Sequence, residues 1–123
     1  MARSEARPER EAAAVARPTV STHVLDTQAG LPRPGVRVRL VRLIDDGAEV
    51  PAGQGITDVD GRIRSLLRGE LTIGDYRLYF DLRGHGGSFF EAMMLQIHIE
   101  DVTHSYHVPL LLAPYAMTTY RGS

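Results

Sequence analysis

The chain has 123 residues, of which 43% are hydrophobic, and this size suits one domain that buries roughly two thirds of its unfolded surface. Fourteen arginines and fifteen acidic residues leave a formal net charge of −1, so the composition indicates neither a nucleic acid partner nor binding to an anionic membrane. The absence of cysteine excludes disulfides, thiolate nucleophiles and cysteine-based zinc sites.

The start of the chain differs in composition from the rest. Residues 1–18 are mainly Ala, Arg, Glu and Pro, which bury too little apolar surface to order a segment, so we expect a disordered tail there, with a short helix over 9–16 as the alternative. The folded domain is expected over residues 19–123. The apolar run at 12–16 is shorter than a secretory core of about 7–15 residues, and no stretch approaches the roughly 20 residues of a membrane span. We therefore expect a cytoplasmic protein with no membrane partner.

From Thr19 onward the sequence has the alternation of β-strands. Tyr76, Leu78 and Phe80 share one face of such a segment, and a slip in the alternation at Val41 predicts a bulge. Residues 89–94 could form one helical turn. The expected strands are 19–26, 36–43, 52–57, 62–67, 75–81, 94–100, 106–113 and 118–120.

About eight short strands separated by turn residues predict an all-β fold, an antiparallel β-sandwich with at most one short helix. A sandwich of this length has exposed edge strands, and such edges favour pairing between subunits. We therefore expect a symmetric oligomer.

Four polar residues stand where strands should be buried or should end. His23 lies within the first predicted strand, Arg62 follows the Asp60-Gly61 turn, His107 precedes an apolar block, and Ser123 is the last residue given. Histidine can act as a base near neutral pH, and arginine can stabilise a developing oxyanion. Each residue alone is more often structural or solvent-exposed, and periodicity does not bring the four together.

Four motifs contain these residues and occur in order along the chain. They are Ser-Thr-His-Val-Leu-Asp at 21–26, Thr-Asp-Val-Asp-Gly-Arg at 57–62, Tyr-His-Val-Pro-Leu-Leu-Leu at 106–112 and Tyr-Arg-Gly-Ser at 120–123. Together they resemble the 5-hydroxyisourate hydrolase family, the enzymatic branch of the transthyretin fold. The last motif separates the hydrolases from the hormone carrier transthyretin, which lacks it.

The resemblance implies a transthyretin-like sandwich with catalytic residues His23, Arg62, His107 and Ser123. It also implies substrate contacts from Arg62, Tyr120 and Ser123, and no metal or organic cofactor. The substrate would be 5-hydroxyisourate, the unstable product of urate oxidase. The resemblance implies a homotetramer, a dimer of dimers, with each site at the interface between dimers.

The chemistry of ring opening fits these residue types. A water must be deprotonated or oriented by His23 or His107, and the sequence does not decide between them. Arg62 can stabilise the carbonyl oxygen as it gains negative charge. The Ser123 hydroxyl could orient water or substrate, and a carboxylate at the chain end could hold a histidine tautomer.

Several positions depart from the family pattern. The loop at 82–88 is short, and Glu91, Ala113, Ala116 and Met117 replace other residues. These departures leave two alternatives, which are a paralogue acting on another cyclic amide and a non-catalytic small-molecule-binding protein.

A further alternative is a zinc site. His98, His104 and His107 lie close together in sequence, and three imidazoles can hold zinc. Alternation along the strand places the His98 side chain on the face opposite Ile97 and Ile99. No carboxylate completes a usual ligand pattern, so a metal site is the weaker hypothesis.

Overall fold

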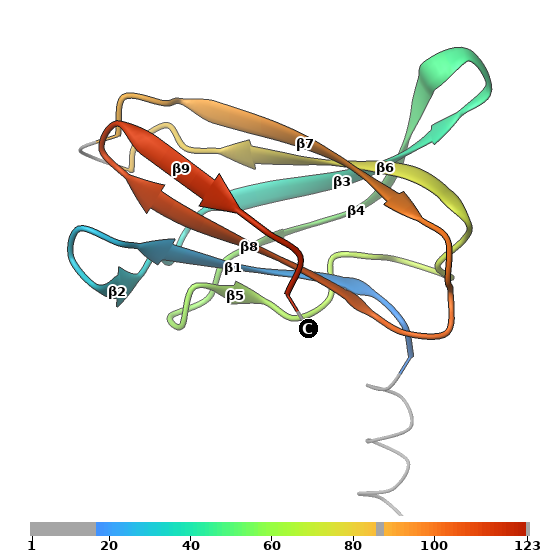
Figure 1. Cartoon of the computed structure of the whole chain (residues 1–123), viewed down its shortest axis with the longest axis horizontal. Helices are drawn as coiled ribbons and strands as arrows, with labels where there is room; N and C mark the ends of the chain where they lie inside the picture. Colours follow the sequence, from blue (N-terminus) through green and yellow to red (C-terminus); the bar gives the residue numbers. More distant parts are fainter. Residues whose placement is uncertain (1–16, 86–87, 123) are drawn as a thin grey trace, which may run out of the picture.

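A computed structural model describes residues 17–85 and 88–122, which form nine strands in two facing sheets (Figure 1). The predicted β-sandwich is confirmed. The predicted tail, with its alternative helix, lies outside the described residues except for Arg17 and Pro18, and so does Ser123. Among the described residues, no helix has the length and apolar character needed to cross a membrane. The strands are β1 Val20–Asp26, β2 Leu31–Pro32, β3 Arg37–Ile44, β4 Ala48–Ile56, β5 Arg62–Ile63, β6 Gly74–Asp81, β7 Ala92–Ile99, β8 Tyr106–Ala113 and β9 Ala116–Thr119.

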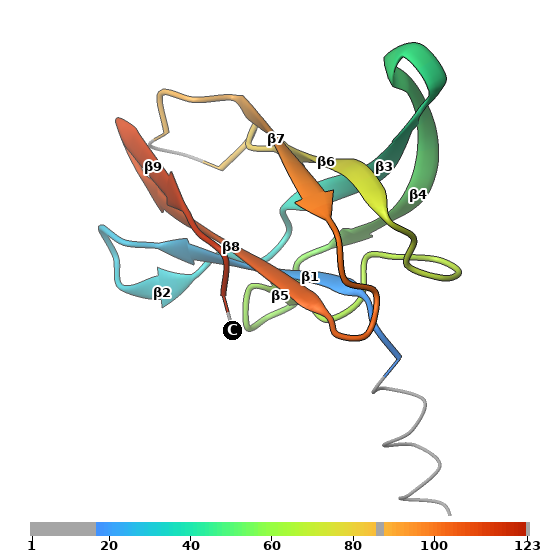
Figure 2. The same ribbon diagram turned by 45° about the vertical axis from the view of Figure 1, so that its right-hand side comes forward.

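One sheet has five strands and the other has four, and they form the two layers visible in Figure 2. Sheet A has the order β2-β1-β8-β9, with β5 also paired to β1, and sheet B has the order β4-β3-β6-β7. Every described pair is antiparallel except β1 with β8, which run parallel over seven residue pairs. This pair departs from the predicted antiparallel pattern. Most of the chain serves as the crossover between β1 and β8, so no tight hairpin fixes their relative direction.

Local details agree only in part with the prediction from alternation. The bulge is confirmed, since the β3–β4 register shifts between Leu40 and Val41. The helical turn predicted at 89–94 is wrong, because β7 already begins at Ala92 and Met93 pairs with Phe80 of β6. The strand expected over 62–67 is shorter, the strand expected over 52–57 is longer, and a short 3-10 turn, η1 (Asp45–Gly47), joins β3 to β4.

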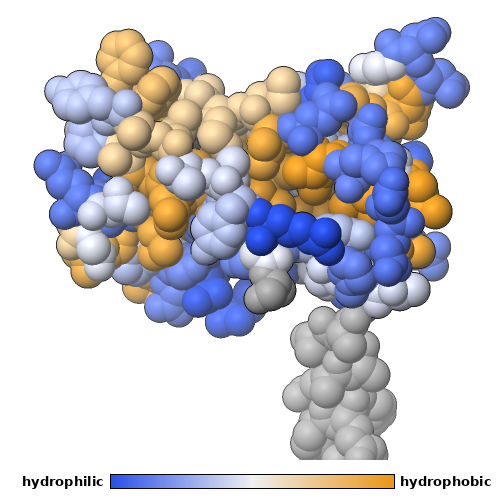
Figure 3. All heavy atoms as spheres, viewed as in Figure 1, coloured by the Kyte–Doolittle hydropathy of each residue, from blue (hydrophilic) through white to orange (hydrophobic). Residues whose placement is uncertain are grey.

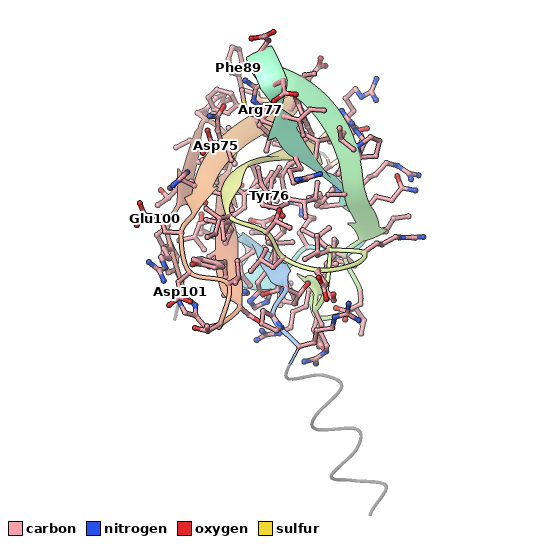
Figure 4. The ribbon with its side chains drawn as sticks, turned by 90° about the vertical axis from the view of Figure 1, so that its right-hand side faces the viewer. Asp75, Tyr76, Arg77, Phe89, Glu100 and Asp101 are labelled. Atoms are coloured by element: carbon pink, nitrogen blue, oxygen red, sulfur yellow. The ribbon has the colours of Figure 1, made fainter. Side chains whose placement is uncertain are left out.

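The core lies between the sheets, and alternate residues of each strand supply it. Tyr76 of β6 points between the sheets, whereas its neighbours Asp75 and Arg77 point away (Figure 4). In β1 the residues Val20, Thr22 and Val24 are buried against this core. The side chains between them therefore face outward from sheet A, and this outer face carries the polar residues of interest.

Truncation of a core residue tests this layer assignment. Leu78 is fully buried, so Leu78→Ala should lower the free energy of unfolding by about 2–5 kcal/mol. Met94 of the same sheet is 48% exposed, so Met94→Ala should change it by roughly 0.5 kcal/mol or less. Urea unfolding curves of both variants provide the comparison, and equal effects would contradict the assignment.

Candidate active site

His23 and Arg62 are direct partners across the β1–β5 pair, so both belong to the outer face of sheet A. The turn before Arg62 is tightly fixed. The Asp58 carboxylate accepts the backbone N–H groups of Asp60 and Arg62, both at 2.9 Å. The bond from the Arg62 N–H is the main cause that lowers the pKa of the Asp58 carboxyl. The turn thus sets Arg62 opposite His23.

Gly61 is required at the centre of this turn. Its φ is +75°, and a Cβ atom built there would lie 2.5 Å from the carbonyl oxygen of Val24. The Gly61 carbonyl also accepts the N–H of Val24 at 2.8 Å. A side chain at this position would be strained and would separate the turn from β1.

The tautomer of His23 is set by a main-chain group. Its Nε2 lies 2.8 Å from the carbonyl oxygen of Asp60, and a carbonyl oxygen can only accept a hydrogen bond. Nε2 therefore carries a proton, and Nδ1 holds the lone pair when the ring is neutral.

His107 of β8 stands in a different environment. It is half-buried, and its Nδ1 lies 2.8 Å from the hydroxyl of Ser21, its direct partner on β1. Burial lowers the pKa of His107, and the charges of Arg62 and His23 lower it further. A lowered pKa favours the neutral form of the His107 ring at neutral pH.

The segment after β9 returns along His107. Gly122 forms an antiparallel bridge with His107 and donates its N–H to the His107 carbonyl at 2.7 Å. Of the four predicted catalytic residues, the structure thus brings together His23, Arg62 and His107. Ser123 is outside the described residues, but it follows directly on Gly122.

Tyr120 lies on the same row of the sheet as His23. The pairs Leu110 with Thr119 and His107 with Gly122 have one constant offset, which places Tyr120 opposite Pro109. Pro109 in turn pairs with His23. Tyr120 is 53% exposed, so it stands at the border of the site and not in the core.

A separate hollow lies between the edges of the two sheets. Tyr120 and Arg121 also line this cleft of about 290 Å³, whose other walls come from β7, β8 and β9. Figure 3 shows apolar side chains gathered in this region, between β7 and β9. His23, Arg62 and His107 do not line it, so the cleft is distinct from the histidine–arginine site.

The three histidines of the zinc hypothesis have three separate partners. His98 Nδ1 bonds Asp75 at 2.6 Å on the outer face of sheet B, and His104 Nδ1 lies 3.0 Å from its neighbour's carbonyl. His107 bonds Ser21 on sheet A. Within residues 17–85 and 88–122, no cluster of three or more His, Asp or Glu side chains could hold a metal ion. The described residues therefore give the zinc hypothesis no support.

The unusual C-terminal residues lie away from the histidines. Ala113 and Ala116 close the β8–β9 hairpin, and six residues of β-strand put Ala113 about 20 Å from His107. Met117 packs against the core, and the Glu91 carbonyl accepts the N–H of Leu82 at 2.9 Å to close the shortened loop. These changes therefore alter the far end of the sheet and the loop, not the immediate surroundings of His107.

Comparison with known proteins agrees with this geometry. A family model described as the HIUase/Transthyretin family matches residues 20–122. The chain is 37% identical to a 5-hydroxyisourate hydrolase of Deinococcus radiodurans, with 86% of this chain and 97% of that protein covered.

Two solved structures are similar along most of the chain. The 5-hydroxyisourate hydrolase of Klebsiella pneumoniae gives a TM-score of 0.70 at 34% identity, covering 85% of this chain and 99% of that one. Transthyretin from Sparus aurata gives 0.78 at 25% identity, covering 86% and 97%. The chain belongs to the HIUase/Transthyretin family, which confirms the family resemblance inferred from the four motifs.

Substitution of Gly61 tests how the turn supports Arg62. Gly30 also has a positive φ, of +71°, but a Cβ there would meet nothing within 4 Å. Gly30→Ala should therefore cost about 1–2 kcal/mol of left-handed strain. Gly61→Ala should cost a further ~1–3 kcal/mol for the contact with Val24. Urea unfolding measures both costs, and equal costs would show that the contact is unimportant.

The charge environment of His107 has a measurable consequence. A lowered pKa means that His107 gains its proton at a lower pH than the ordinary value of 6.5. Arg62→Gln removes a cation that opposes protonation, so the pKa of His107 should rise. It should stay below the ordinary value because burial of the ring remains. Arg64→Gln, at an exposed arginine two residues away, should leave it unchanged. NMR titration of the imidazole measures this, and an unmoved titration midpoint in Arg62→Gln would exclude the coupling.

Proposed function

We propose that the protein hydrolyses 5-hydroxyisourate, opening its ring at an amide-like C–N bond in the degradation of urate. The observation that carries the proposal is the position of His23, Arg62 and His107 together on one face of sheet A. This grouping supplies two imidazoles and a fixed cation. The similar proteins from Deinococcus radiodurans and Klebsiella pneumoniae are 5-hydroxyisourate hydrolases, which supports the same reaction.

In the proposed reaction His107 is the general base. Its neutral ring takes a proton from water at Nε2 as the water oxygen bonds to the substrate carbonyl carbon. The carbonyl oxygen becomes an oxyanion, and Arg62 stabilises it. The C–N bond then breaks, and His107 transfers the proton that it took from water to the leaving nitrogen. Water is thereby added across one bond, and the enzyme returns to its starting state.

His23, Ser123 and Tyr120 have supporting roles in this proposal. With its Nε2 proton directed at the Asp60 carbonyl, His23 can accept a hydrogen bond from water or a substrate N–H at Nδ1. The Ser123 hydroxyl would orient water or substrate, and Tyr120 would bound the pocket. The steps use side chains alone, so the proposal includes no metal or organic cofactor.

We also propose a homotetramer, a dimer of dimers, in which each site is completed where two dimers meet. The outer face of sheet A supports this arrangement, because it carries half-buried Leu25 and Leu111 beside the polar residues. A mixed apolar and polar face of this kind suits burial against another copy. The assignment to the cytoplasm stays a prediction.

An ultraviolet assay of 5-hydroxyisourate, generated in place from urate and urate oxidase, tests the function. The protein should speed decay above the spontaneous rate. His107→Ala should lose about 10²–10⁴-fold in rate, as for a general base. Arg62→Ala should lose about 10²–10³-fold, as for an oxyanion donor.

Arg64→Ala is the matched control, since it removes an exposed arginine two residues from Arg62 and should retain full activity. No acceleration by folded wild-type protein would refute the proposed function. Decay accelerated equally by the His107 variant would refute the role of that residue while leaving the reaction in place.

A further inference from the structure

We propose that Ser21 is a positioning residue for His107, holding its imidazole so that Nε2 alone faces the substrate. The inference rests on the proposed function and adds a residue whose importance neither its position nor its type suggests. Ser21 lies within the first strand and directly opposite His107, with its hydroxyl 2.8 Å from Nδ1.

The pairing of β1 with β8 holds this contact in place from the core side of sheet A. The next residue along β1, Thr22, is buried, and its hydroxyl donates to the Val108 carbonyl at 2.6 Å. This bond ties β1 to β8 beside the Ser21–His107 pair. The serine hydroxyl is thus presented to His107 by a rigid element, as a positioning group requires.

The opposite edge of the imidazole is held by Gly122. A Cβ atom built on Gly122 would lie 2.7 Å from His107 Cδ2 and 3.3 Å from its Cγ. The backbone of Gly122 therefore packs closely against this edge of the ring. Nδ1 and Cδ2 are the two ring atoms bonded to Cγ, so Ser21 and Gly122 hold the two edges and leave the outer end, with Nε2, for the substrate.

A hydroxyl at Nδ1 suits a base that later becomes an acid. A serine oxygen can accept a hydrogen bond from the Nδ1–H of a neutral imidazole, and in that tautomer the Nε2 lone pair is available. The same bond persists in the imidazolium, which then returns its proton from Nε2. Because the hydroxyl has no charge, it does not favour the protonated ring as a carboxylate would, and the nearby charges of Arg62 and His23 also oppose protonation.

Three serine variants test the role. Ser21→Ala should lower kcat about tenfold with little change in KM, the effect of one lost hydrogen bond that orients a catalytic group. Ser21→Thr retains a hydroxyl at the same position and should restore kcat to within about threefold. Ser65→Ala removes another serine hydroxyl, bonded to Thr19 at 2.8 Å, and should leave kcat unchanged.

The ¹⁵N NMR signals of the His107 ring give a second readout that needs no substrate. In Ser21→Ala the Nδ1 signal should shift as its hydrogen bond is lost, while Ser21→Thr and Ser65→Ala should retain the wild-type pattern. Urea midpoints near that of the wild type would show that the fold is intact. Unchanged ring signals in Ser21→Ala would overturn the proposal, and so would an unchanged kcat. If wild-type protein fails to hydrolyse 5-hydroxyisourate, the proposed function fails, and the ring signals alone decide the role of Ser21.

Discussion

Pairing of β1 with β8 is the contact on which the site depends. It aligns Ser21 with His107 and His23 with Pro109, and the bridge to Gly122 and the β5 turn then attach on either side. The parallel register determines which residues of β1 and β8 lie directly opposite each other and which are offset by one residue. A slip of one residue would turn His107 toward the core and Val108 toward the outer face.

The same sheet serves two purposes through its two faces. One face buries Val20, Thr22 and Val24 against sheet B, and the other carries the histidines and Arg62. The core therefore supports the polar groups from the opposite face of the sheet. Two histidines on this support differ because one contacts a carbonyl and the other a hydroxyl. The carbonyl, which can only accept, fixes the tautomer of His23, whereas the hydroxyl, which can donate or accept, allows either tautomer of His107.

The sequence predicts the strands well because alternation of apolar and polar residues is local information. It predicts the bulge at Val41 for the same reason. The turn expected at 89–94 is wrong because helix-forming residues there join a ladder with Phe80, and tertiary pairing outweighs their local preference. The family motifs point to His23, Arg62 and His107, but their adjacency depends on register, which alternation does not specify. Ser21 gives no signal of its own, since a serine in a strand is ordinary until its partner is known.

The separation of Ser21 and His107 along the chain links the site to the folding of the whole domain. The two residues are 86 positions apart, so their contact closes a loop that contains most of the molecule. Forming it carries a large loss of chain entropy, and folds dominated by such distant pairings form slowly. A partly folded chain that has made only its local hairpins, such as β3–β4 or β6–β7, has no site at all. The geometry of the candidate site and the closure of the fold are thus a single event, and a fragment lacking either β1 or β8 retains neither.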